Sequence, residues 1–159
     1  MTARALWVRS AAGDIVLLAA CIAIAAGVAI ALGQDANWDL QNYHFYDPWA
    51  LIHGRALGHD VAAAQLQTYL NPLLDVPFYA MVAADWNPRI ITAVLALPAG
   101  VSAWLLAKIA WALFDDPDPR ARIGATIAAL AIGLTSAMAV GTLGTTMNDW
   151  PGTAFTLGA

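Results

Sequence analysis

The sequence has no glutamate, only one cysteine and few charged residues. These shortages argue against an ordinary soluble domain, against acidic residues along exposed helix faces, and against an internal disulfide. Only 11% of the 159 residues are charged, whereas about a quarter are charged in an ordinary soluble domain. All eleven acidic residues are aspartate, which favours caps and turns over helix interiors, so we expect them in loops and at helix ends. Cys21 has no partner for an internal disulfide. The net charge of −4 argues against nucleic acid as a partner.

The hydrophobic residues, which make up 60% of the chain, gather in long runs. A run of about 17–25 apolar residues can cross the ~30 Å hydrocarbon layer as a helix. We therefore predict an all-α membrane protein with a single transmembrane domain, and we expect the sequence to be a fragment that continues beyond residue 159. The predicted spans are about 15–33, 90–114, 123–141 and the start of a further span from 152, with an outer loop at 34–88.

The first run allows a second interpretation, a signal peptide cleaved near Gly33. Its apolar core is longer than the ~7–15 residues typical of such peptides, so we predict an uncleaved anchor. Basic residues set the orientation, because they concentrate before the first span and around the turn at 115–122, whereas the loop 34–88 has only one arginine. We predict a multi-pass protein of a bacterial-type inner (plasma) membrane with a cytoplasmic N-terminus.

The outer loop 34–88 predicts short juxtamembrane helices that lie in the interface. Asp47-Pro48 is typical of a helix start, with Asp47 as N-cap and Pro48 at the first helical position, and Gly54 is expected just past that helix's end. The segment 60–86 has apolar stretches broken by Pro72 and Pro77, so it is not expected to form one spanning helix.

The stretch 37–55, NWDLQNYHFYDPWALIHGR, is dense in groups that could bind a metal, a phosphate or a sugar. Plain structural interpretations exist for each of them. Asp39 and Asp149, the latter in a later loop, can each be a helix cap, and Asp47 is better explained as a cap than as a ligand. Each histidine taken alone is better explained as a surface or interfacial residue, and the aromatic side chains as anchors at the membrane interface. The arrangement of these residues along the chain is more specific than any one of them.

Several features occur in a fixed order. Asp39 opens the first outer loop, with Tyr43 and Gly54 after it. An apolar segment with prolines, residues 71–79, follows, and Arg89 opens the second span. A second outer loop ends in Asn148-Asp149-Trp150-Pro151. This order resembles the N-terminal part of the GT-C superfamily of integral-membrane glycosyltransferases. The resemblance is nearest to the polyprenyl-phosphate-sugar-dependent branch with the protein O-mannosyltransferases and aminoarabinose transferases.

The resemblance implies transfer of a sugar from a polyprenyl-phosphate-linked donor, held in the membrane lipid, to an unidentified acceptor at the outer face. Asp39 and Asp149 match the family's acids in its first and second outer loops. The resemblance implies that both are catalytic and that both could hold a divalent cation, Mg²⁺ or Mn²⁺. Leu40 departs from the pattern, because many members have a second acid there.

Substrate-binding residues are expected beside these acids: Tyr43, His44, Arg55 and Arg89. The enzyme is expected to need the rest of its chain, so the fragment alone would be inactive. A non-catalytic membrane protein, such as a transporter subunit or an envelope assembly factor, is the alternative. No acid lies in the middle of a predicted span, whereas ion-coupled carriers place ionisable groups there.

Overall fold

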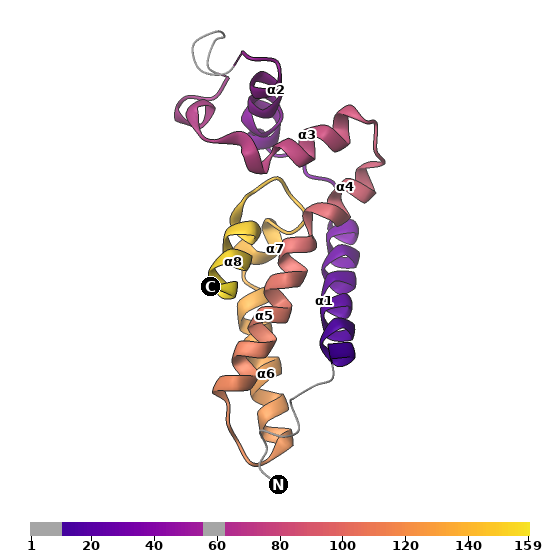
Figure 1. Ribbon diagram of the computed structural model, residues 1–159, viewed down its shortest axis with the longest axis vertical. Helices are drawn as coiled ribbons and strands as arrows, with labels where there is room; N and C mark the ends of the chain where they lie inside the picture. Colours follow the sequence, from indigo (N-terminus) through magenta and orange to yellow (C-terminus); the bar gives the residue numbers. More distant parts are fainter. Residues whose placement is uncertain (1–10, 56–62) are drawn as a thin grey trace.

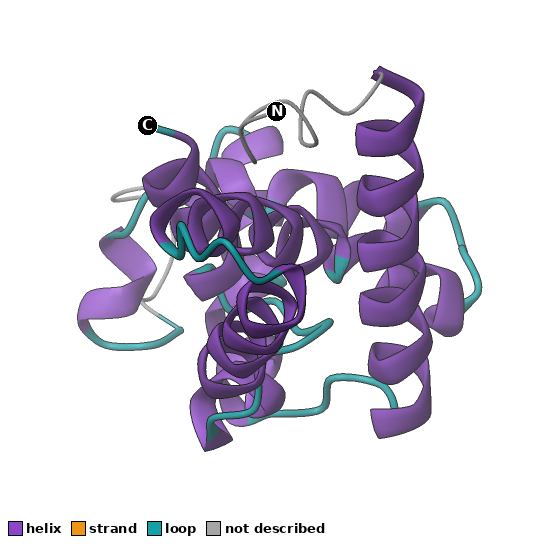
Figure 2. Ribbon diagram, turned by 90° about the horizontal axis from the view of Figure 1, so that it is seen from below, coloured by secondary structure: helices purple, strands orange, loops and turns teal. Residues whose placement is uncertain are grey.

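The computed structural model describes residues 11–55 and 63–159, and every regular element in these ranges is a helix (Figures 1 and 2). Long helices run along the long axis of the molecule and short helices gather at one end (Figure 1). The all-α prediction is therefore confirmed. Arg4 and Arg9, which entered the predicted orientation, and residues 60–62 of the predicted outer loop lie outside the described residues.

Two described helices are long and apolar enough to cross a membrane. The first, α1 (Ala11–Leu32), covers the first predicted span and begins four residues before it. The second runs from Pro88 to Leu113 and covers the second predicted span. It consists of α4 (Pro88–Leu95) and α5 (Leu97–Leu113), interrupted at Ala96. The interruption lies just before Pro98, which lacks the N–H that a continuous helix needs.

The third predicted span, 123–141, is wrong as a single helix. The structure has α6 (Pro119–Leu134) and α7 (Ala137–Gly141), separated at Thr135 and Ser136. Ser136 is extended, and its hydroxyl accepts a hydrogen bond from the Ala139 amide, so it is the N-cap of a new helix. With 16 residues, α6 is only ~24 Å long, shorter than the hydrocarbon layer.

The central helix of the bundle is α5, which packs against α1, α6 and α8 (Asp149–Gly158). It contacts α1 closely at Gly100, where a Cβ would lie 2.6 Å from the Cα of Ile22. It also contacts α6 closely at Gly133, where a Cβ would lie 2.8 Å from Cδ2 of Leu106, whereas Gly124 and Gly141 face open space. Glycine therefore allows close helix packing on two sides of α5.

Polar contacts join the helices at the end far from the short helices. Lys108 of α5 donates a 2.8 Å hydrogen bond to Asp14 of α1. Arg122 of α6 is buried and donates two hydrogen bonds to the backbone carbonyl of Trp111, at 3.0 and 2.6 Å, while its guanidinium stacks 4.4 Å from the centre of the Trp111 ring. The charged turn predicted at 115–122 is thus a short connection followed by the first turn of α6.

The opposite end holds what we call the head region, the described residues 34–55 and 63–87. Its elements are η2 (Leu40–His44), α2 (Tyr46–Ile52), η3 (Leu66–Tyr69), η4 (Pro72–Leu74) and α3 (Val76–Ala83). Over 63–86 the chain is broken into short helices, as the prolines predicted. Phe78 and Met81 of α3 pack on Ile91 of α4, which fixes the head region on the end of the bundle.

Candidate functional site

Two side chains of the candidate site, His44 and Asp47, come from one short helical run, η2 followed by α2. Asn37 accepts a 2.7 Å hydrogen bond from the Leu40 amide, and η2 then forms a π-type turn, a feature often found at functional sites. His44 ends η2 and Asp47 lies in the first turn of α2. Side chains three positions apart share a helix face, so His44 and Asp47 point the same way, and both are buried.

The expected helix start at Asp47-Pro48 is wrong by two positions. The helix α2 begins at Tyr46 and Phe45 occupies the N-cap position, so Asp47 does not cap it. Pro48 is fully buried. The predicted end is confirmed, because α2 stops at Ile52 and Gly54 follows with a φ of +67°. Asp47 is therefore a buried carboxylate without the capping role that would explain it.

A second buried carboxylate reaches the same place from another part of the head region. Asn71 caps η4 by accepting a hydrogen bond from the Leu73 amide at 3.1 Å. Asp75 follows η4 and occupies the N-cap position of α3, yet its side chain makes no capping hydrogen bond. Instead Oδ1 of Asp75 lies 3.0 Å from Nδ1 of His44, and both side chains are less than a tenth exposed.

The three side chains form what we call the acid–histidine cluster: His44, Asp47 and Asp75. Although His44 and Asp75 are at ion-pair distance, their geometry makes no hydrogen bond at Nδ1. Nε2 of His44 and Oδ1 of Asp47 are also buried without a hydrogen-bond partner. Buried polar atoms normally have partners, so the unpartnered atoms of this cluster indicate a place for a bound group.

The electrostatics of the cluster favour the protonated form of one carboxyl group. Burial raises the pKa of Asp47 from 3.8 to about 6, with a further upward contribution from the negative charge of Asp75 and a smaller downward one from His44. A carboxyl group with a pKa near neutrality can both release and accept a proton under ordinary conditions.

The cluster opens into a cavity of about 260 Å³. One wall is formed by residues of η2, α2 and η4, and the other by Met147 and Asn148 of the loop before α8. Asp35 holds this loop in place, because one carboxylate oxygen accepts hydrogen bonds from the amide and hydroxyl of Thr146, both at 2.9 Å. The two predicted outer loops therefore meet at one site. The lining residues are Tyr43, His44, Asp47, Leu70, Asn71, Pro72, Asp75, Met147 and Asn148.

Among the residues predicted from sequence, Tyr43 and His44 line this cavity and Asp39 does not. Burial, followed by the negative charge of Asp39, raises the pKa of Tyr43. The rings of Tyr43 and His44 have centroids 4.2 Å apart. Asp39 is half-buried and its side chain caps no helix, so the plain helix-cap interpretation of Asp39 is wrong.

Asp39 and Asp149, which the resemblance implies are both catalytic, lie in the two loops that meet at the cavity. Asp149 is exposed in the first turn of α8, next to Asn148, which occupies the N-cap position. Neither Asp39 nor Asp149 is among the residues that line the cavity. The acids that do line it, Asp47 and Asp75, were not chosen from the sequence.

The two predicted arginines lie elsewhere. Arg55 follows the end of α2, with its guanidinium 5.6 Å from the centre of the Trp49 ring. Arg89 is exposed in the first turn of α4 and lines a separate cavity of about 370 Å³ with Gly33 and Gln34. Neither arginine lines the cavity of the acid–histidine cluster.

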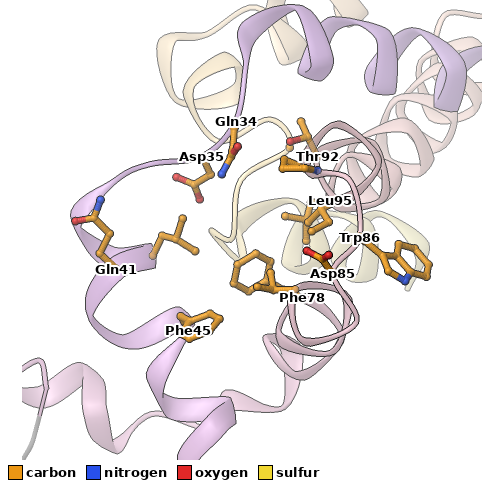
Figure 3. A pocket seen from close by; sticks show the side chains of 14 residues that line it. Gln34, Asp35, Gln41, Phe45, Phe78, Asp85, Trp86, Thr92 and Leu95 are labelled. Atoms are coloured by element: carbon orange, nitrogen blue, oxygen red, sulfur yellow. The ribbon is translucent and has the colours of Figure 1, made fainter.

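A larger and mostly apolar cavity of about 470 Å³ lies between the start of the head region, α3 and α4. Figure 3 shows Gln34 and Asp35 on one side of it and Phe78, Leu95 and Asp85 on the other. Phe45 lines this cavity and directly follows His44, which lines the cavity of the acid–histidine cluster. Adjacent residues of one helical run therefore line the two cavities.

The sequence did contain a signal for the residues that were missed. Asp75 is flanked by Leu73-Leu74 and Val76-Pro77-Phe78, and Asp47 by Tyr46 and Pro48-Trp49. When apolar neighbours become buried, an acid between them is buried as well. Its carboxylate then needs a hydrogen-bond donor or an opposite charge. Asn148 could not be chosen this way, because exposed amides are common in loops.

Within 11–55 and 63–159, no three His, Cys, Asp or Glu side chains are placed to hold a metal ion. The predicted Mg²⁺ or Mn²⁺ site at Asp39 and Asp149 therefore has no matching ligand set in the described chain. The divalent cation stays a prediction, and no step considered below depends on it.

No family model, no curated protein and no solved structure matches this chain.

Proposed function

We propose that this chain is the N-terminal part of a membrane glycosyltransferase of the GT-C type, which transfers a sugar from a polyprenyl-phosphate-linked donor to an acceptor at the outer face of the membrane. One observation carries the proposal. A buried cluster of two carboxylates and an imidazole, with unpartnered polar atoms, opens into a cavity at the end of a bundle of apolar helices. Such a cluster is costly to bury unless a ligand uses it.

The cluster has the chemistry that sugar transfer needs. An acceptor hydroxyl or amine must lose a proton as it attacks the anomeric carbon of the donor, and a carboxylate near it can accept that proton. Asp47, with its pKa of about 6, is ionised at neutral pH and still basic enough for this role. His44 and Tyr43 stand beside it and can hold sugar hydroxyl groups.

The apolar parts of the molecule suit a donor that is anchored in lipid. The helix α1 has one buried residue, Ala29, and most of its residues are exposed. The face turned away from α4 and α5 is therefore available to lipid, as expected of a membrane span. The apolar cavity and the cavity of the acid–histidine cluster are both lined by residues of the head region, which lies at one end of the bundle (Figure 1). The part of a polyprenyl chain next to the phosphate would fit such a cavity.

The remaining predicted residues keep roles in the proposal. Arg89 stands exposed at the N-terminal end of α4, where a guanidinium can bind a phosphate through two hydrogen bonds. Asp39 would act through its negative charge on Tyr43, whose side chain lines the cavity. Asp149 and Arg55 would act at the edge of the site. The distribution of basic residues supports an orientation with the head region outside an inner membrane.

Donor-dependent transfer by the full-length protein in membranes tests the proposal. A radiolabelled polyprenyl-phosphate-linked sugar is added, and label in a product that is no longer attached to lipid is counted. We expect transfer by the wild type, a loss of at least about tenfold in Asp39→Asn, and full transfer by Asp116→Asn, in the turn at the other end of the bundle. Absence of donor-dependent product with the wild type would favour the non-catalytic alternative.

A further inference from the structure

The cavity of the acid–histidine cluster has an unusual balance of charge for an enzyme whose donor carries a phosphate. Its lining contains two aspartates, one histidine and two asparagines, and neither lysine nor arginine. Asp47 and Asp75 are both buried, and the negative charge of Asp75 adds to the effect of burial that raises the pKa of Asp47. An anionic group placed here would face these carboxylates at close range with little water to screen them. The lining therefore selects against phosphate.

The same lining suits a ligand that donates hydrogen bonds. Oδ1 of Asp47 is a buried acceptor without a donor, and Nε2 of His44 is buried without a partner. Hydroxyl or ammonium groups would satisfy Asp47, and a hydroxyl group can also pair with either form of the imidazole. At about 260 Å³, the cavity is smaller than the ~300–1,000 Å³ pockets that enclose drug-sized ligands, so it takes one unit of about sugar size.

We propose that this cavity binds the acceptor, as a sugar-sized polyol or amino sugar without phosphate, and that Asp47 is the group that takes the acceptor's proton. The role as acceptor site rests on the proposed function, but the choice of ligand does not. The donor phosphate binds outside this cavity, so the reacting atoms of the two substrates meet at its opening, beside Tyr43 and His44.

The chemical step balances without any further reactant. The acceptor oxygen or nitrogen forms a bond to the anomeric carbon of the donor sugar, and the bond from that carbon to the phosphate oxygen breaks. The leaving polyprenyl phosphate keeps the electron pair, and the acceptor's proton passes to a carboxylate oxygen of Asp47. Among the described residues, the ionisable groups that face Asp47 are Asp75, between η4 and α3, and His44 and Tyr43 of η2. Asp75 positions His44 and does not itself contact the reacting atoms.

The choice of ligand is tested by measuring the binding of small probes to the full-length protein in detergent. Binding is measured by ligand-observed NMR at pH 7.5. The probes are glucosamine, methyl β-glucoside and glucose 1-phosphate. We expect glucosamine to bind most tightly, methyl glucoside next, and glucose 1-phosphate at least about tenfold more weakly than glucosamine. Equal or tighter binding of the phosphate ester, or no binding of any probe, would overturn the proposal.

Substitutions in the cavity test whether the probes bind at the acid–histidine cluster. Asp47→Asn should weaken glucosamine at least about fivefold, whereas Asp116→Asn should leave it unchanged. His44→Gln, which keeps a neutral polar group, provides a second test if Asp47→Asn lowers the unfolding temperature, and it should weaken methyl glucoside. Unchanged affinity in a folded Asp47→Asn or His44→Gln protein would contradict the assignment.

The result is distinguishable from failure of the proposed function. If no donor-dependent transfer is found but the order of probe binding and the effects of the variants hold, then the cavity is a sugar site and the glycosyltransferase proposal fails. If transfer occurs but Asp47→Asn transfers at the wild-type rate, then the function stands and the acceptor site lies elsewhere.

Discussion

Asp47 holds its proton to a higher pH in the folded protein than in the unfolded chain, because it is buried beside Asp75. Folding therefore takes up a proton between about pH 3.8 and pH 6, and the stability that Asp47 contributes falls as the pH rises through this window. We expect the wild type to lose on the order of 1–2 kcal/mol more than Asp47→Asn between these limits, since water in the cavity screens part of the repulsion. Thermal unfolding in detergent at a series of pH values measures the difference.

The exposed Asp116 provides the control for this comparison. Its side chain accepts a 2.8 Å hydrogen bond from the Asp118 amide, which an asparagine oxygen can also accept, so Asp116→Asn should follow the wild-type curve. If Asp47→Asn also followed the wild-type curve, Asp47 would not be in the environment described.

The sequence predicted some of the residues that line the cavity and missed others. Tyr43 and His44 were chosen because they stand in a dense polar stretch, and both line the cavity. Asp47 was assigned to a cap because Asp-Pro usually starts a helix, but the preceding π-type turn carries the helical run past it. Asp75 comes 28 positions after Asp47 in the chain, and only the tertiary fold shows that they meet.

The crossing of α1 and α5 depends on the missing side chain of Gly100. A methyl group there would collide with the Ile22 backbone at 2.6 Å, and relief would require the two helices to separate. We expect Gly100→Ala to lower the free energy of unfolding by about 1–3 kcal/mol. Chemical denaturation in mixed micelles, monitored by circular dichroism, measures the change.

Gly27 is a matched control on α1, because a Cβ there would have no atom within 4 Å. Gly27→Ala should be neutral or stabilising by up to about 1 kcal/mol through helix propensity. Equal losses in both variants would mean that the crossing is not where the structure places it.

Asp35 and Thr146 join the two loops that form the cavity, although they are 111 positions apart in the sequence. Asp35→Ala should cost about 2–3 kcal/mol, because it leaves the buried Thr146 amide unpaired. Thr146→Val removes only the hydroxyl group and should cost about 1 kcal/mol. In a double-mutant cycle the two changes should couple by about 1 kcal/mol. Strict additivity would show that the loops are not joined by this contact.

Helices with a simple apolar pattern were predicted well, and those with polar interruptions were not. The pattern placed α1 and the Pro88–Leu113 helix within a few residues. The run 123–141 is equally apolar, but Thr135 and Ser136 offer side-chain hydrogen bonds to the backbone that end one helix and start another. Hydropathy does not measure hydrogen bonding between side chains and the backbone, so it did not predict the break between α6 and α7.

Two loops far apart in the sequence lie at one end of the helix bundle, and the turn at 115–118 lies at the other (Figure 1). If the bundle crosses a membrane in the proposed orientation, a membrane-impermeant thiol reagent added to intact cells should label Tyr69→Cys and spare Pro117→Cys, both made in a Cys21→Ser background. Tyr69 is 59% exposed, so access within the fold is not limiting. Labelling of Pro117→Cys alone would reverse the orientation and place the acid–histidine cluster inside the cell.

The pH dependence of donor-dependent transfer by the full-length protein in membranes tests the central claim, that Asp47 accepts the acceptor's proton, most directly. For the wild type we predict a rate that rises with pH and levels off above about pH 6, the pKa of Asp47. In Asp47→Asn the rate should fall by about 10²–10⁴-fold and lose this rise, while Asp116→Asn keeps both. A folded Asp47→Asn protein with the wild-type rate and pH profile would contradict the claim.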